Sequence, residues 1–409
     1  MLALGEVIIK IIYGIVPGIQ YMKVVQHILS VLFILTFSVI SAAQDSIKQP
    51  SQDSLKIKGQ ASGWINYNFV NHLPVYFGGR YIPQLNYNLN LKNDHKIDFE
   101  ASLNINGNAG FNPFDSIQAT GQLKPYRLWA RYSTRQFELR VGLQKINFGS
   151  ASILRPLMWF DQMDPRDPLK LTDGVWGVLG RYYFLNNANI WLWGLYGNNK
   201  PRGWEPTSTN SSYPEAGGRF QLPVTKGEMG FSYNYRIADT RNLSAIMPAF
   251  SMVPENKVGF DIKLDMAVGL WFEGSWVNKS KNLGVYTNQE ILNAGTDYTF
   301  GLGNGLYIIY EQLVATYDEK PFTFQNATTF SLLSLSYPVG LFDNISGIVY
   351  YDWKNRKIYN FLNWQKQFNN ISLYFMGYWN PEMYNIPAQG EGQNLFAGRG
   401  LQVMVVWNH

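Results

Sequence analysis

The residues with the clearest chemical potential in this sequence are arginines on the polar side of segments in which polar and apolar residues alternate. Six arginines have this placement: Arg127, Arg131, Arg140, Arg181, Arg219 and Arg236. A guanidinium group stays charged and binds a carboxylate or phosphate through two parallel hydrogen bonds. A row of such groups would either guide an anionic solute, such as an acidic sugar, or pair with nearby acids and brace the fold.

The segments that follow carry mostly carboxylates on the equivalent face. These acids are Asp261, Asp265, Glu273, Asp297, Glu311 and Asp352, interspersed with Lys257 and Lys263. If this face lines an aqueous lumen, it also includes Lys56, Lys58, Asp98, Glu100, Glu138 and Glu228. The six arginines and four lysines then balance the ten acids in number, but the arginines form a basic arc that is separate from the acidic one. The resulting transverse field favours polar solutes, and the cancelling totals argue against strong anion selectivity.

The segment from Gly149 to Asp173 (GSASILRPLMWFDQMDPRDPLKLTD) differs from the alternating segments. It is about 25 residues long, and loops of this length are usually functional or disordered. Its three prolines prevent regular helix or strand pairing, while its apolar residues can pack. We expect the segment either to fold inward and narrow a pore or to pack on an outer rim. Its polar contacts would come from Arg155, Asp161, Asp164, Arg166, Asp167 and Asp173.

Other chemistry is poorly represented. Aspartates are typical calcium ligands, but the spacing in this segment fits no calcium loop that we can identify, so we predict no metal and no cofactor. The chain has no cysteine and only four histidines, and it contains neither G-x-S-x-G nor H-E-x-x-H. We therefore expect no enzyme. The net charge of +5 is too small and too scattered for nucleic-acid binding.

The elements that must position these residues are long strands. Beyond Leu55 no apolar run approaches the roughly 20 residues of a membrane-spanning helix. Instead, apolar residues alternate with polar ones, as between Ile97 and Ile105, in segments of about 9–14 residues, against about 5–6 for an average strand. Aromatic residues gather near the segment ends, as in membrane interfaces. The sequence therefore predicts an all-β protein, a single transmembrane antiparallel β-barrel closed on itself.

We expect about eighteen strands, with sixteen as the alternative. They are placed at 55–69, 83–92, 95–107, 123–133, 136–148, 174–185, 189–198, 215–224, 227–238, 256–266, 268–279, 290–300, 305–317, 325–337, 343–353, 356–367, 370–380 and 398–409. Connections after even-numbered strands are mostly short. Those after odd-numbered strands are mostly longer: 70–82, 108–122, 149–173, 199–214, 239–255, 280–289 and 381–397. Short periplasmic turns and long extracellular loops are typical of outer-membrane barrels.

The N-terminal segment is predicted to direct export. Residues 22–43 contain a basic start, an apolar stretch and a small-residue end, the layout of a signal peptide. We interpret residues 1–21 as a start-site overcall, with an uncleaved N-terminal anchor as the alternative. Residues 44–54 form a polar, flexible periplasmic lead-in, and residues 55–409 form the barrel. The chain ends on His409, two residues beyond Trp407, whereas bacterial barrels often end on an aromatic residue.

One stretch resembles a known group of proteins. The run Gly142-Leu143-Gln144-Lys145-Ile146-Asn147-Phe148-Gly149, followed by Arg155-Pro156, Asp164-Pro165-Arg166-Asp167-Pro168 and Arg181-Tyr182-Tyr183, is similar to porin-like outer-membrane barrels, particularly the alginate-export type. The likeness covers about 45 residues. It implies a single barrel, often of eighteen strands, that passes polar or acidic saccharides through an arginine-rich lumen. The composition also resembles that of Bacteroidota outer-membrane proteins.

These observations predict a porin-like channel of the bacterial outer membrane for passive diffusion of small hydrophilic solutes, with acidic sugars or other anions as candidates. Its expected partners are membrane lipid, the solute and the barrel-assembly machinery. The alternative is a surface binding or assembly protein that contacts a polysaccharide or partner through external loops. Aromatic residues in those loops that would stack on sugars are Trp204, Tyr213, Trp379 and Tyr384.

Overall fold

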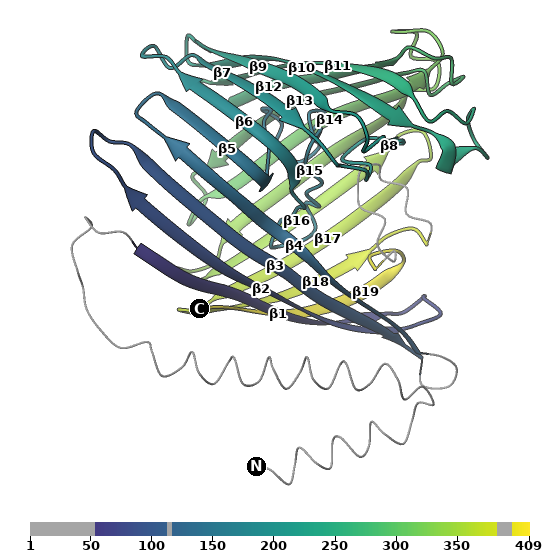
Figure 1. The fold of residues 1–409 in the computed structure, drawn as a ribbon. Coiled ribbons are helices and arrows are strands. Elements are labelled where there is room, and N and C mark those ends of the chain that lie inside the picture. Colours follow the sequence, from purple (N-terminus) through teal and green to yellow (C-terminus); the bar gives the residue numbers. More distant parts are fainter. Residues whose placement is uncertain (1–53, 113–116, 383–394) are drawn as a thin grey trace, which may run out of the picture. The chain divides into compact units, whose positions relative to one another are not determined.

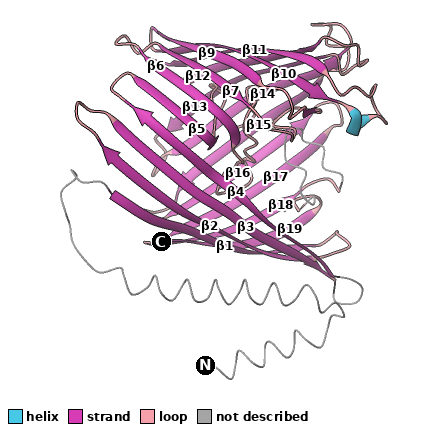
Figure 2. Ribbon diagram, in the orientation of Figure 1, coloured by secondary structure: helices cyan, strands magenta, loops and turns pink. Residues whose placement is uncertain are grey.

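The structure, a computed structural model, describes residues 54–112, 117–382 and 395–409. The predictions for residues 1–53 (start-site overcall, signal peptide and most of the lead-in) lie outside the described residues, as does Tyr384. Within the described part of the chain, the structure is a single closed sheet of antiparallel strands (Figure 1). Its one short helix is the 3₁₀ turn η2 (Arg241–Leu243), visible in Figure 2.

Eighteen strands form the barrel wall. They are β1 (Ser54–Asn68), β2 (Val75–Asn90), β3 (Lys96–Phe111), β4 (Ile117–Ser133), β5 (Phe137–Gln144), β6 (Val175–Tyr183), β7 (Asn189–Leu195), β9 (Glu215–Val224), β10 (Gly227–Asp239), β11 (Val253–Asp265), β12 (Gly269–Lys279), β13 (Asn288–Phe300), β14 (Leu306–Asp318), β15 (Thr328–Pro338), β16 (Asp343–Asp352), β17 (Lys357–Gln367), β18 (Ile371–Trp379) and β19 (Arg399–Asn408). The two-residue strand β8 (Ser208–Thr209) pairs only with the end of β10. The predicted fold class and strand number are confirmed.

The barrel closes where β1 pairs with β19, from Gln60 opposite Asn408 to Asn68 opposite Gly400. At this junction the His409 ring lies over Gly59, where a Cβ atom would come within 2.2 Å of the ring. The absence of a side chain at Gly59 therefore leaves room for the last residue. His409 also donates its backbone N–H to the Gly59 carbonyl at 2.9 Å. No lateral edge remains at this junction, as a membrane barrel requires.

The predicted boundaries differ most from the structure at two places. Strand β2 begins at Val75 and β4 begins at Ile117, so most of the predicted loops 70–82 and 108–122 is strand. Glycines in both stretches interrupt the apolar alternation, which hid the strands from a pattern search. In the structure these glycines lie opposite one another, Gly63 with Gly79 and Gly107 with Gly121. Cross-strand pairing thus continues through positions that carry no side-chain signal.

The outer face of the wall is apolar. In β19 the alternate residues Leu401, Val403 and Val405 are exposed, whereas Gln402 and Val406 are buried. Such alternation is expected when one face of the sheet meets lipid. No helix among the described residues is long and apolar enough to cross a membrane.

The predicted polar lumen is only partly observed. Leu179, Trp193 and Leu195 of β6 and β7 are apolar and lie on the inner side, where they pack against residues 145–174. The rule that apolar side chains face only outward therefore fails along these two strands, because a loop inside the barrel covers their inner face.

Candidate functional site

The connection between β5 and β6, residues 145–174, occupies the interior of the barrel, and we call it the inner segment. Strand β5 ends at Gln144, directly opposite the first residue of β6, Val175. Strand β4 continues from Leu128 to Ile117 beyond its last pairing with β5. The inner segment consequently leaves the wall partway along the barrel rather than at its rim. It leaves close to Gly149, which has a φ of +107° and whose Cβ position lies 2.4 Å from a Glu273 oxygen, so a larger residue would not fit.

Apolar side chains attach the inner segment to two regions of the wall. Phe148, Trp159 and Phe160 pack with residues of β6 and β7 in one cluster. Leu154 and Met158 belong to a second cluster, with Leu313, Phe330, Leu332, Tyr350 and Tyr359 of β14–β17 among its members. The interior of the barrel therefore contains a hydrophobic core of its own.

Wall carboxylates hold the backbone of the inner segment. Glu311 accepts hydrogen bonds from the backbone N–H groups of Ser152, Ile153 and Leu154 at 2.8, 3.0 and 2.6 Å. Glu273 accepts from the amides of Ala151 and Leu157 at 2.8 and 2.6 Å. These bonds satisfy amides that a loop without secondary structure would otherwise leave unpaired.

Asp261 accepts a hydrogen bond from the Ser150 hydroxyl at 2.8 Å. It resembles Glu273 and Glu311 in being at most 1% exposed. These three acids were expected to border open water, whereas they lie between the wall and the inner segment. The remaining three acids of the predicted arc differ. Asp265 is exposed at the end of β11, and Asp297 accepts a hydrogen bond from the Tyr307 hydroxyl at 2.8 Å. Asp352 is buried at the end of β16, where it accepts from the backbone N–H groups of Lys354 and Asn355 at 3.0 Å.

The polar residues of the inner segment form mostly local contacts. Arg155 pairs with Asp161 at 2.7 Å in a buried position, and Arg166 pairs with Asp164 at 2.6 Å. Asp173 reaches the wall and pairs with Lys124 of β4 at 2.6 Å. The segment is thus stiffened internally and tied to the wall at both ends of its length.

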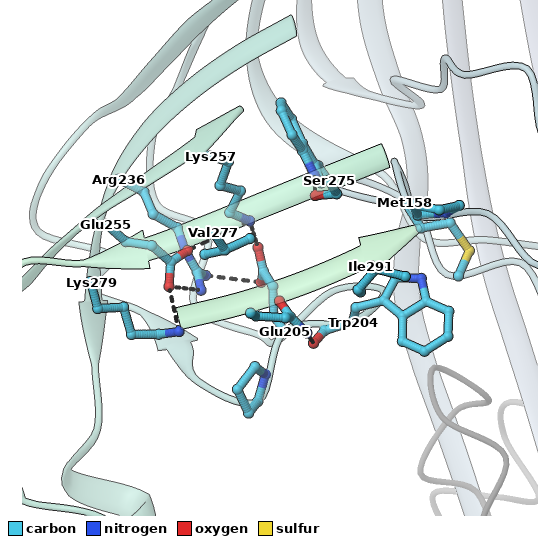
Figure 3. A pocket seen from close by; sticks show the side chains of 14 residues that line it. Met158, Trp204, Glu205, Arg236, Glu255, Lys257, Ser275, Val277, Lys279 and Ile291 are labelled. Carbon is cyan, nitrogen blue, oxygen red and sulfur yellow. Dashed lines mark hydrogen bonds and ion pairs between the residues drawn. The ribbon is translucent and has the colours of Figure 1, made fainter. Parts of the chain in front are cut away.

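A second connection, residues 196–214 between β7 and β9, also contributes side chains to the interior. The Trp204 indole N–H donates to the Arg155 carbonyl at 2.8 Å, and its own carbonyl accepts from Gln289 at 2.9 Å. The neighbouring Glu205 enters a buried ion cluster with wall residues, shown in Figure 3. The two connections therefore support each other inside the barrel.

In this cluster, Arg236 pairs with Glu255 at 2.6 Å and with Glu205 at 2.9 Å. Lys257 contacts Glu205, and Lys279 lies 3.6 Å from Glu255 (Figure 3). Burial by itself would raise the pKa of the Glu205 carboxyl, but the neighbouring cations, Arg236 first, outweigh it and lower that pKa. The carboxylate form of Glu205 is therefore favoured by its surroundings.

The six predicted arginines fall into two groups. Arg219 and Arg236 are buried in ion pairs, Arg219 with Asp261 at 2.5 Å. Arg127 is also buried and donates to the Thr172 carbonyl of the inner segment at 2.9 Å. Their geometry corresponds to bracing, one of the two roles that the sequence left open.

Arg131, Arg140 and Arg181 lie around the single carboxylate Glu138, at 3.7, 3.0 and 3.7 Å. Arg131 also pairs with Asp98 at 2.7 Å. Their side chains keep 31, 15 and 16% of their surface accessible. These three arginines therefore remain candidates for contact with an anion.

The inner segment borders a cavity of about 260 Å³ next to β4–β6 and two larger cavities, which polar and apolar side chains line together. The first of the larger cavities, of about 500 Å³, lies between the inner segment and strands β1–β4; the second, of about 370 Å³, lies between the inner segment and strands β14–β18. Asp164 and Asp167 line both larger cavities. The inner segment therefore divides the interior of the barrel without filling it.

Sequence reasoning missed two charged residues of the first cavity. One is Lys124 of β4, and the other is Arg80 of β2. It lies in the stretch assigned to a loop, although Tyr76, Gly78 and Arg80 alternate with Phe77 and Gly79. Its guanidinium lies 5.7 Å from the Trp64 ring. Burial raises the pKa of Asp167, and the positive charge of Arg80 counteracts this in part. The cavity thus has a cation on its wall and an acid on the inner segment.

Among the described residues, no group of three or more His, Asp or Glu side chains is placed to hold a metal ion. Asp161, Asp164 and Asp173 of the inner segment each pair with a different cation, as given above.

Comparison with known proteins adds information on the fold. No protein-family model matches the sequence, and neither does any curated protein. Among solved structures, OccAB4 from Acinetobacter baumannii matches with a TM-score of 0.52 and 13% identity, over 88% of this chain and 100% of that chain. OccK5 (OpdH) from Pseudomonas aeruginosa matches with a TM-score of 0.51 and 12% identity, over 87% of this chain and 97% of that chain.

Both are outer-membrane porins. The chain has a porin-like fold. At these identities the likeness concerns the path of the backbone alone, and the contents of the barrel must be judged from this chain's own residues.

Proposed function

We propose that this protein is a channel of the bacterial outer membrane through which small hydrophilic solutes diffuse passively. The observation that carries the proposal is the pair of larger cavities beside an inner segment held by wall carboxylates. The apolar exterior supports the location, because such a face is stable in lipid and not in water. The predicted signal peptide at residues 22–43 and delivery by the barrel-assembly machinery belong to the same proposal.

The finer proposal concerns anions. Arg131, Arg140 and Arg181 surround Glu138, and Arg131 also pairs with Asp98, so these three cations face two carboxylates and one positive charge is left on the wall. Such a surface would attract acidic sugars or other carboxylates. This agrees with the resemblance to alginate-export-type barrels. The predicted pore-lining roles of these arginines and the predicted narrowing role of the inner segment are parts of this proposal.

The test is osmotic swelling of liposomes that contain the purified protein, with a panel of neutral and acidic sugars of increasing size. We expect swelling for small sugars and a cut-off as size rises. Protein that folds into the liposomes but admits no sugar would contradict the channel. The reversal potential under a salt gradient tests the finer proposal. We expect the reversal potential to shift toward the equilibrium potential of the anion, and we expect Arg140→Ala to reduce this shift.

A further inference from the structure

The strands that line the cavity of about 370 Å³ beside β14–β18 carry a patch of uncharged polar side chains next to apolar ones such as Ile348 and Met376. Across three neighbouring strands, Ser336 lies opposite Ser346, which lies opposite Asn363. In the adjacent row, Asn344 lies opposite Gln365. Directly opposed residues lie about 4.5–5.5 Å apart, so these hydroxyl and amide groups form one continuous surface, and all of them line the cavity.

Several of these groups have no partner in the described part of the chain. Ser336 donates to Asn344 at 3.1 Å. Ser346 and Gln365 make no such side-chain bond there, and the side-chain amide oxygen Oδ1 of Asn363 is buried and unpaired. A buried polar atom without a partner is costly unless water or a ligand satisfies it. The surface therefore presents donors and acceptors that are free to bind a solute.

Aromatic rings border this surface. Tyr307 of β14 lies opposite Ser336, and Tyr374 of β18 lies opposite Gln365. Both line the cavity. Rings beside a hydroxyl and amide surface suit a sugar, whose C–H faces contact aromatic carbon while its hydroxyls hydrogen-bond.

The position of the charged residues differs between this cavity and the one beside β1–β4. Among the described residues that line it, those from strands β14–β18 carry no charge. The first cavity has Arg80 and Lys124 on its wall. The charged residues that line the second cavity all belong to the inner segment: Arg155, Asp164, Arg166, Asp167 and Lys170. Arg155 and Arg166 are paired with Asp161 and Asp164. A solute on the strand wall of the second cavity therefore meets only neutral hydrogen-bonding groups. An uncharged solute loses little hydration at the second wall.

We propose that the cavity beside β14–β18 is a binding site for an uncharged saccharide of about one or two sugar rings. The inference rests on the proposed channel function and assigns a solute class to one of its two larger cavities. It departs from the acidic-sugar proposal, which concerns the arginines on the other side of the barrel.

The test measures binding of maltose to the full chain in detergent micelles by titration calorimetry, with lactobionate as a charged disaccharide of similar size. We expect maltose to bind more tightly than lactobionate. The double variant Asn363→Ala/Gln365→Ala should weaken maltose binding about tenfold, the loss expected for two neutral hydrogen bonds. The matched control is Asn106→Ala/Gln122→Ala, which removes two opposed amides from the first cavity and should leave maltose affinity unchanged.

Equal maltose affinity in the unmodified protein and in the Asn363/Gln365 variant would overturn the proposed site. The site would also be overturned if lactobionate bound more tightly than maltose and the same variant weakened lactobionate binding. Heat-dependent gel mobility shows whether each variant is folded. Liposome swelling separates the two proposals. Maltose binding without swelling would contradict the channel and support the binding site. Swelling without saturable maltose binding would support the channel and contradict the binding site. If the double variant does not fold, Ser346→Ala supplies the same comparison with a smaller change.

Discussion

The side of the barrel formed by β9–β14 and the sides formed by β1–β4 and β15–β18 follow the same inward and outward alternation but have different interiors. On the first, charged side chains such as Arg236 and Glu273 are buried in ion pairs and hydrogen bonds to inserted loops. On the others, polar side chains such as Asn106 and Gln365 line cavities. An inward polar residue in a barrel is therefore not necessarily in contact with solute. Its role depends on whether a loop covers it.

The largest expected effect comes from disrupting the buried ion pairs, and it is on the free energy of unfolding. Arg236→Ala leaves Glu205 and Glu255 buried without their main partner, and breaking a buried ion pair typically costs about 3–5 kcal/mol. The matched control is Arg135→Ala, which removes an exposed pair with Asp94 and should change stability by less than about 1 kcal/mol. Urea unfolding followed by tryptophan fluorescence measures both. Equal losses would mean that the ion cluster does not fasten the loops.

A second expected effect is on conductance. Glu311→Ala removes the acceptor for three backbone amides of the inner segment, each costing about 1–3 kcal/mol when left buried and unpaired. The segment should then leave the wall and widen the bore, so that single-channel conductance rises about twofold or more. Glu228→Gln, at a residue that contacts Gln221, is the control. Unchanged conductance in Glu311→Ala would show that the segment does not limit flow.

A smaller effect is expected on ion selectivity. Arg80→Ala removes a cation from the wall of the first cavity, where Asp164 and Asp167 remain. The local potential becomes more negative, so the ratio of anion to cation permeability should fall, by roughly a factor of two. The reversal potential under a salt gradient measures this ratio. An unchanged potential would place the ion path away from this cavity.

The smallest effect concerns pH. Because burial raises the pKa of Asp167, this carboxyl takes up its proton at a higher pH than an ordinary aspartate. As the pH falls, this carboxyl is therefore protonated before an ordinary aspartate, the cavity loses negative charge and selectivity should shift toward anions. Asp167→Asn should remove this part of the shift and show the low-pH selectivity throughout. Identical pH profiles would exclude Asp167 as the titrating group.

Much of the wall could be predicted from the sequence. The alternation in segments such as Val258 to Met266 reflects one face in lipid and one face inside, and this two-residue period follows directly from strand geometry. It located every wall strand, but it failed where glycines replaced the outer apolar residues, as at Gly79 and Gly121.

The interior could be predicted only in part. The prolines and apolar residues of 149–173 indicated a packed, irregular segment, but not that Glu273 and Glu311 would hold its backbone. Nor did the sequence distinguish Arg236, buried in a cluster, from Arg140, which keeps some accessible surface. Both arginines have the same position in the alternation.

What the sequence by itself determined is therefore the closed antiparallel wall, since residue order along a strand fixes which side chains share a face. Only the tertiary structure decided which inward residues meet a loop and which meet a cavity. These contacts join residues distant in the chain, such as Leu154 with Glu311, and they depend on where β5 and β6 end along the barrel. The local sequence pattern carries no information about such long-range contacts, because they form only once the sheet has closed.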